Sequence, residues 1–117
     1  MSSKYPPSEL PPNLTRQEYI RDLLASYRRT PGTCGRTRAS DHTLAGQLYD
    51  RHIPLQVAET ALLLATARRL LNRPADAPQL ATVRSLNYYM PVVDELVANP
   101  PDPAYIHYLR RRLSQPL

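Results

Sequence analysis

The sequence contains one cysteine, three histidines, no tryptophan and no phenylalanine among its 117 residues. Its single cysteine, Cys34, excludes a disulfide within the chain and a metal site made of several cysteines. The histidines at positions 42, 52 and 107 lack the spacing of metal ligands. The longest unbroken apolar run, Ala61 to Ala65, is far shorter than a membrane span. We therefore expect no metal or other cofactor and no membrane segment.

Glycine is also rare, with three residues against thirteen prolines. Residues 1–14 contain four prolines and no hydrophobic period, which predicts a flexible proline-rich arm. In residues 15–117 the apolar side chains recur at helical spacing, and no stretch alternates as a half-buried strand does. We therefore expect one domain of the all-α class, a single compact bundle of about five helices.

Capping residues and prolines predict where these helices begin and end. Residues 15–18 fit a capping box, and Ser40 and Ser85 are expected to cap two later helices. Pro91 either kinks the helix after Ser85 or marks its true start. The segment 54–72 is apolar nearly all round, so it should be the central helix. The predicted helices span residues 16–29, 41–51, 54–72, 86–98 and 103–113.

Tyrosine supplies the whole aromatic set, with eight residues. In the helix 103–113, Tyr105 recurs with Ile106, Leu109 and Leu113 at helical spacing. These four side chains are expected to face the core.

Catalysis finds little support in the sequence. No glycine-rich phosphate loop, H-E-x-x-H pair or calcium-binding loop occurs. Cys34 lies in a basic loop, where we favour an incidental thiol over a nucleophile. Asp94 and Glu95 are adjacent, so they point to different faces of a helix and are expected to be solvated charges. We predict that the chain is not an enzyme.

The positive charge is unevenly distributed along the chain. The net charge of +5 arises from +4 over residues 15–40 and +3 over residues 105–117, while residues 73–104 carry −2. Clustered arginines are typical of contacts with nucleic-acid phosphates. The other interpretation is that they only solubilise helix ends. The candidate phosphate ligands are Arg28, Arg29, Arg36, Arg38, Arg110, Arg111 and Arg112.

The helices 41–51 and 54–72 are joined by a short connector, as in a helix-turn-helix motif. In that interpretation Gln56 and Thr60, at the start of the second helix, could contact base edges, whereas Glu59 would repel phosphate. The alternative is a plain hairpin of two helices that enters no groove.

Residues 44–97 also carry a family resemblance. The stretches LAGQLYDRHIPLQVAETALLLATARR and RSLNYYMPVVDEL resemble the DnaD-type primosomal domain and similar phage replication proteins. Tyr49 and His52 stand where that family commonly has tryptophan and glycine. The resemblance implies a helical module that binds DNA or a replication partner, with Tyr88, Tyr89 and the run 110–112 as its working surface. Core packing is the alternative role for Tyr89.

Together these observations predict a small non-enzymatic DNA-binding or replication-accessory protein of a bacterial mobile element or phage-like locus. It would dock on phosphates through arginines, with DNA favoured over RNA, and would contact a replication protein or a second copy of itself. The first ten residues contain no apolar stretch typical of a secretory signal, which favours a cytoplasmic location. The alternative is a helical protein–protein adaptor or dimerisation module without nucleic-acid binding. Convergence of the arginines on one face would favour nucleic acid.

Overall fold

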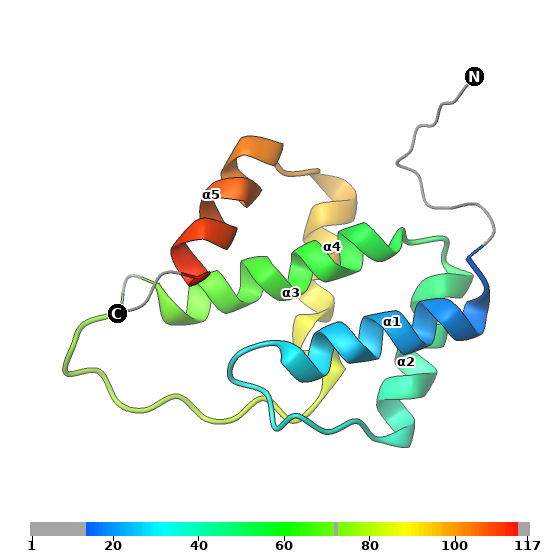
Figure 1. Cartoon of the computed structure of the whole chain (residues 1–117), viewed down its shortest axis with the longest axis horizontal. Coiled ribbons are helices and arrows are strands. Elements are labelled where there is room, and N and C mark those ends of the chain that lie inside the picture. Colours follow the sequence, from blue (N-terminus) through cyan, green and yellow to red (C-terminus); the bar gives the residue numbers. More distant parts are fainter. Residues whose placement is uncertain (1–13, 72, 115–117) are drawn as a thin grey trace.

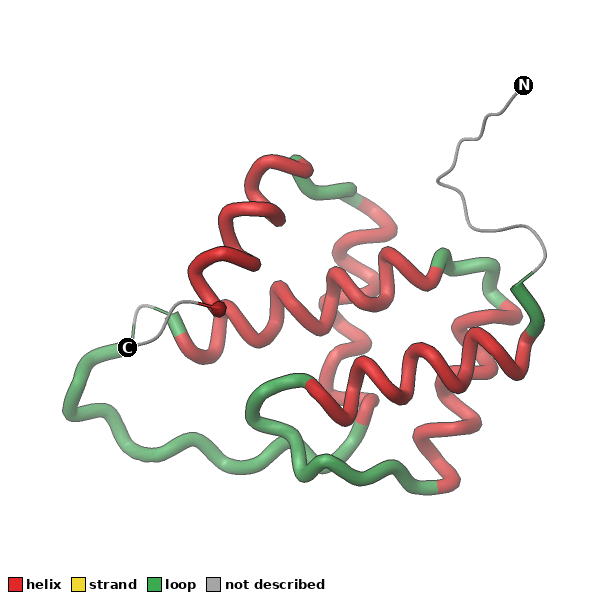
Figure 2. The backbone as a smooth tube through the Cα atoms, in the orientation of Figure 1, coloured by secondary structure: helices red, strands yellow, loops and turns green. Residues whose placement is uncertain are grey.

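The fold is all-α, as a computed structural model shows for residues 14–71 and 73–114 (Figure 1). Those residues contain no strand, and Figure 2 shows helices joined by loops. The predicted fold class is confirmed, because five α-helices and one short 3-10 turn make up the described secondary structure. The elements are α1 (Arg16–Arg29), α2 (Ala39–Asp50), α3 (Leu55–Leu70), η1 (Leu86–Tyr89), α4 (Met90–Ala98) and α5 (Pro103–Ser114).

Helix α1 begins at the predicted capping box. The Thr15 hydroxyl accepts the Glu18 N–H at 3.0 Å, and the Glu18 carboxylate accepts the Thr15 N–H at 2.9 Å. The bond from the Thr15 backbone lowers the pKa of Glu18. Residue 14, which we assigned to the arm, is Leu14 and packs half-buried against the core. The rest of the predicted arm, 1–13, lies outside the described residues.

Helix α3 is the centre of the packing, as its apolar sequence predicted. It contacts α1 on one side and α4 and α5 on the other, whereas α2 packs mainly against α1 and η1. This arrangement differs from the predicted helix-turn-helix pair, because α2 and α3 are neighbours in sequence but not close packing partners. Thr60 is only 8% exposed, and Glu59 accepts a hydrogen bond from Ser26 of α1. Of the two side chains predicted to contact base edges only Gln56 is exposed, which argues against base recognition by the start of α3.

Two other predicted helix starts are displaced. Helix α2 begins at Ala39 rather than after Ser40, because the Asp41 carboxylate accepts the Arg38 N–H at 2.9 Å. Ser85 caps the 3-10 turn η1 through the Asn87 N–H, and α4 starts only at Met90. Pro91 therefore marks the true start of α4, where its missing N–H costs no hydrogen bond.

Asp41 ties the first half of the fold to the second. Its side chain is 1% exposed, and its other carboxylate oxygen accepts the buried Leu86 N–H at 2.9 Å. One buried carboxylate thus fixes the start of α2 and the start of η1. A buried charge is tolerated only when hydrogen bonds replace its lost water, so both contacts are needed.

Replacing Asp41 with alanine should lower the free energy of unfolding by about 2–4 kcal/mol. The substitution removes two charge-assisted hydrogen bonds and leaves a buried N–H without its acceptor. Urea denaturation with an unchanged m-value measures the effect. The control, Asp76→Ala, removes an exposed loop carboxylate and should change stability by less than about 0.5 kcal/mol. Equal stability of the two variants would contradict the role of Asp41.

The buried tyrosine hydroxyls supply a second test of the core. The Tyr19 hydroxyl donates to the Ile53 carbonyl at 2.8 Å, whereas those of Tyr27 and Tyr89 have no partner among the described residues. Tyr19→Phe should therefore cost about 1 kcal/mol of stability, while Tyr27→Phe and Tyr89→Phe should be neutral or stabilising. Thermal unfolding of the three variants gives the order, and a destabilised Tyr27→Phe would show that its hydroxyl is bonded.

Candidate nucleic-acid interface

Three helices of the described chain end in a pair of arginines. The last turns of α1, α3 and α5 each carry two guanidinium groups. A cation at a helix C-terminus is locally favourable, because the carbonyl end of the helix dipole is negative. The pairs are Arg28 and Arg29, Arg68 and Arg69, and Arg111 and Arg112.

Two of these helix ends lie together, and the turn after the third reaches them. In Figure 1 the C-terminal ends of α3 and α5 meet at the left of the helices, whereas α1 ends nearer the middle of the view. The turn after α1 still reaches the end of α3, since Gly32 and Arg69 line the same pocket. α3 packs against both neighbours, so the positions of the three ends are coupled. We call the six arginines of the last turns, together with Arg110, the basic end. It contains five of the seven predicted phosphate ligands.

Few of these cations have an acidic partner. The ion pairs in the described part of the chain join Arg16 to Asp50, Arg21 to Asp22, Arg51 to Asp94, and Arg68 to Glu95. None of the seven predicted arginines forms such a pair with a described carboxylate. The prediction that Asp94 and Glu95 are surface charges is confirmed, since both are exposed. The basic end is therefore compensated by one carboxylate, that of Glu95.

The pair Arg68–Glu95 links α3 to α4 at this end. Two hydrogen bonds, 2.8 and 2.6 Å long, join the guanidinium to the carboxylate, and they lower the pKa of Glu95. Arg69 donates to the Ala81 carbonyl at 2.6 Å and lies over the Tyr88 ring. Sequence reasoning missed Arg68 and Arg69 because residues 41–72 carry no net charge. The repeated arginine pair at helix ends was the available signal.

The other predicted contacts lie away from the basic end. Arg36 and Arg38 belong to the loop between α1 and α2, which leads from the end of α1 to the start of α2 (Figure 1). Gln56 and Thr60 lie at the opposite, N-terminal end of α3. Thr60 is buried and was wrongly expected at an exposed position. Only Gln56 of that pair is exposed.

A groove of about 580 Å³ runs between the start of α3, the end of α4 and the start of α5. Its apolar wall includes Val57, Val97 and Ile106, and Val97 is exposed. Gln56 and Arg110 lie in the same lining. This groove is the structural feature that an adaptor function would use.

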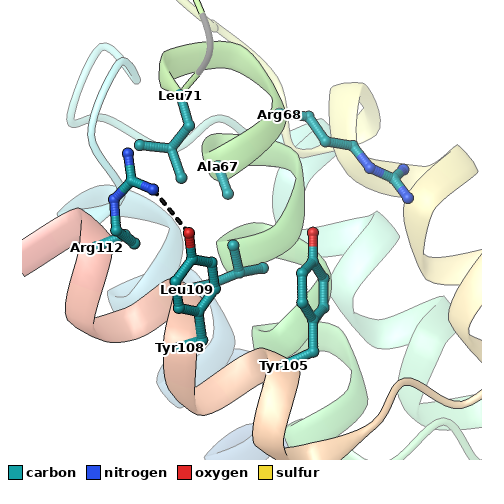
Figure 3. A pocket seen from close by; sticks show the side chains of 7 residues that line it. All are labelled: Ala67, Arg68, Leu71, Tyr105, Tyr108, Leu109 and Arg112. Atoms are coloured by element: carbon teal, nitrogen blue, oxygen red, sulfur yellow. Dashed lines mark hydrogen bonds between the residues drawn. The ribbon is translucent and has the colours of Figure 1, made fainter.

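Two tyrosines of α5 lie beside the basic end (Figure 3). Tyr105 is 49% exposed, contrary to its predicted inward position, and Tyr108 is 46% exposed. Only Ile106 and Leu109 of α5 are buried, because α5 packs against α3 with a narrow stripe. Of the tyrosines implied by the family resemblance, Tyr88 is exposed and Tyr89 is fully buried in the core.

No match was found when the chain was compared with models of known protein families, with curated proteins and with solved structures. Within the described residues, no helix combines the length and apolar character needed to cross a membrane. The same residues contain no cluster of three or more histidine, cysteine or acidic side chains that could hold a metal ion.

The Glu95 carboxyl should titrate below the ordinary glutamate pKa of 4.5, because Arg68 stabilises its charged form. The ion pair thus favours the folded state above the unfolded pKa, and this contribution is lost as the pH falls through the folded pKa. NMR of the Glu95 side chain measures the midpoint of its titration, and the substitution Arg68→Gln should raise that midpoint. An unchanged midpoint would show that the pair does not persist in solution.

Proposed function

We propose that this chain is a non-enzymatic nucleic-acid-binding protein that holds phosphates at the basic end. The observation that carries the proposal is the convergence of three arginine-tipped helices with one compensating carboxylate. Guanidinium groups suit this task because their planar donors match phosphate oxygens in pairs. A polyanion offers many such oxygens along one line.

The location of the arginines argues against a role in solubility alone. Solubility depends on net charge and is served by arginines anywhere on the surface. Here Arg16, Arg21 and Arg51 are neutralised by carboxylates, while Arg28 and Arg29 at the end of α1 and the arginines of α5 form no ion pair with a described carboxylate. Like charges that gather on one side repel each other, and a bound polyanion removes that repulsion.

The resemblance of residues 44–97 to DnaD-type and phage replication proteins favours DNA as the polyanion and a replication-accessory role. Within this proposal Arg28 and Arg29 of α1 and the arginines of α5 contact phosphates, and no base is read by the start of α3. Arg36 and Arg38 lie in the loop after α1, away from the basic end, and are not part of the proposed contact.

A second candidate function is a protein adaptor. The apolar groove between α3, α4 and α5, with Val97 exposed on its wall, favours a protein partner. Arg110 belongs both to the groove lining and to the basic end, so a partner protein in the groove would cover one of the proposed phosphate contacts.

Binding should weaken steeply with salt. If about five arginines neutralise duplex phosphates, log K falls with log salt at a slope of roughly −4.5. Arg110→Gln, Arg111→Gln and Arg112→Gln together should reduce this slope to about −1.8. Fluorescence anisotropy with labelled DNA at about 50 and 200 mM salt measures both values.

The control variant combines Arg16→Gln, Arg21→Gln and Arg51→Gln. It removes the same charge from three paired, exposed arginines and should leave the slope nearly unchanged. Equal losses in the two triple variants would show that net charge, not the basic end, determines binding. No binding at the lower salt concentration would overturn the proposed function.

A further inference from the structure

We propose that Tyr105 and Tyr108 of α5 form a stacking platform for unpaired bases, so that the ligand is single-stranded nucleic acid. This inference rests on the proposed function and names the form of its ligand. The platform comprises two half-exposed rings beside the arginines of α5. Aromatic rings next to a basic surface are the usual means of holding a single strand without sequence preference.

The two rings already have a stacked geometry. Tyr105 and Tyr108 are three residues apart on one helical face, with ring centroids 6.3 Å apart and planes inclined by 26°. Figure 3 shows both rings directed from α5 toward α3. They line a small pocket of about 110 Å³ together with Ala67 and Leu71 of α3. An arriving base therefore meets preformed apolar surfaces and little ordering is required.

Arg112 holds Tyr108 in place. Its guanidinium donates to the Tyr108 hydroxyl at 2.7 Å and lies 5.8 Å from the ring centroid. Arg112 lies beside Tyr108, and Arg68 lies on the side of Tyr105 (Figure 3). Arg112 forms no ion pair with a described carboxylate, so it can hold a phosphate beside the rings, whereas Arg68 is already bound to Glu95. A strand held by Arg112 can turn its bases toward the rings.

The geometry favours a single strand over a duplex. In a duplex the faces of the bases are covered by their stacked neighbours, so an exposed tyrosine can meet a base face only where a strand is unpaired. The same chemistry accommodates DNA and RNA, because each of their bases has a flat apolar face.

The test compares labelled oligodeoxyuridine, oligouridine and a duplex, each about ten nucleotides long, by anisotropy at one salt concentration. The double variant Tyr105→Leu and Tyr108→Leu should weaken single-strand binding by about five-fold or more, without a comparable loss for the duplex. The variant Tyr105→Phe and Tyr108→Phe keeps the rings and should retain most of the affinity. Tighter binding of either single strand than of the duplex supports the inference. The preferred sugar shows whether the ligand is DNA or RNA.

Val97→Ala is the control for exposed apolar surface. Val97 is also half-exposed, at 52%, but it belongs to α4 and lies outside the pocket that the two rings line. Its loss should leave single-strand affinity unchanged. A loss equal to that of the α5 double variant would show that exposed apolar surface in general, and not the α5 platform, binds the strand.

A direct reporter exploits the absence of tryptophan. Tyr105→Trp places a single indole on the platform, and oligothymidine should quench its fluorescence by stacking. Duplex binding that is salt-dependent, at least as tight as single-strand binding and insensitive to the leucine variant would overturn this inference but leave the proposed function intact. No binding of any oligonucleotide would overturn both. Self-association that the leucine variant abolishes, measured by sedimentation, would assign the rings to a dimer interface instead.

Discussion

The Asp41 carboxylate accepts one N–H at the start of α2 and another at the start of η1, and the placement of the later helices depends on this bridge. η1 leads directly into α4, and α4 meets α3 through the Arg68–Glu95 pair. α5 follows α4 after a short loop rich in proline and packs back on α3. The contact between Asp41 and Leu86 joins residues 45 positions apart. The positions of the helix ends that carry the arginine pairs depend on this contact.

Much of the fold could be predicted from local chemistry. The capping box at Thr15 and Glu18 and the proline at the start of α5 act within one helical turn, so the sequence alone identifies both boundaries. The start of α2 could not be found in this way. Ser40 is the better local cap, but Asp41 competes because its carboxylate also reaches Leu86, which no local pattern reveals.

Of the candidate site, only the surplus of positive charge could be predicted from the sequence. The surplus of arginine in α1 and α5 is visible in the sequence, but Arg68 and Arg69 are hidden in a neutral segment. Burial depends on the partners of each helix. Thr60 is buried because α3 has neighbours on both sides, and Tyr105 is exposed because α5 packs mainly on α3. Helical spacing identifies which residues lie on the apolar face of a helix. How much of that face is buried depends on how many other helices pack against it.

The same asymmetry explains why α5 is the centre of the proposed interface. A helix that packs on one partner leaves most of its circumference in solvent, so three successive arginines can point in directions about 100° apart and still remain hydrated. Arg110 faces the apolar groove, and Arg112 faces the tyrosine pair. A helix buried like α3 could not carry this set, because each guanidinium would need a partner inside the protein. Because α5 packs on α3 through only a narrow buried stripe, this short helix can expose arginines and tyrosines together.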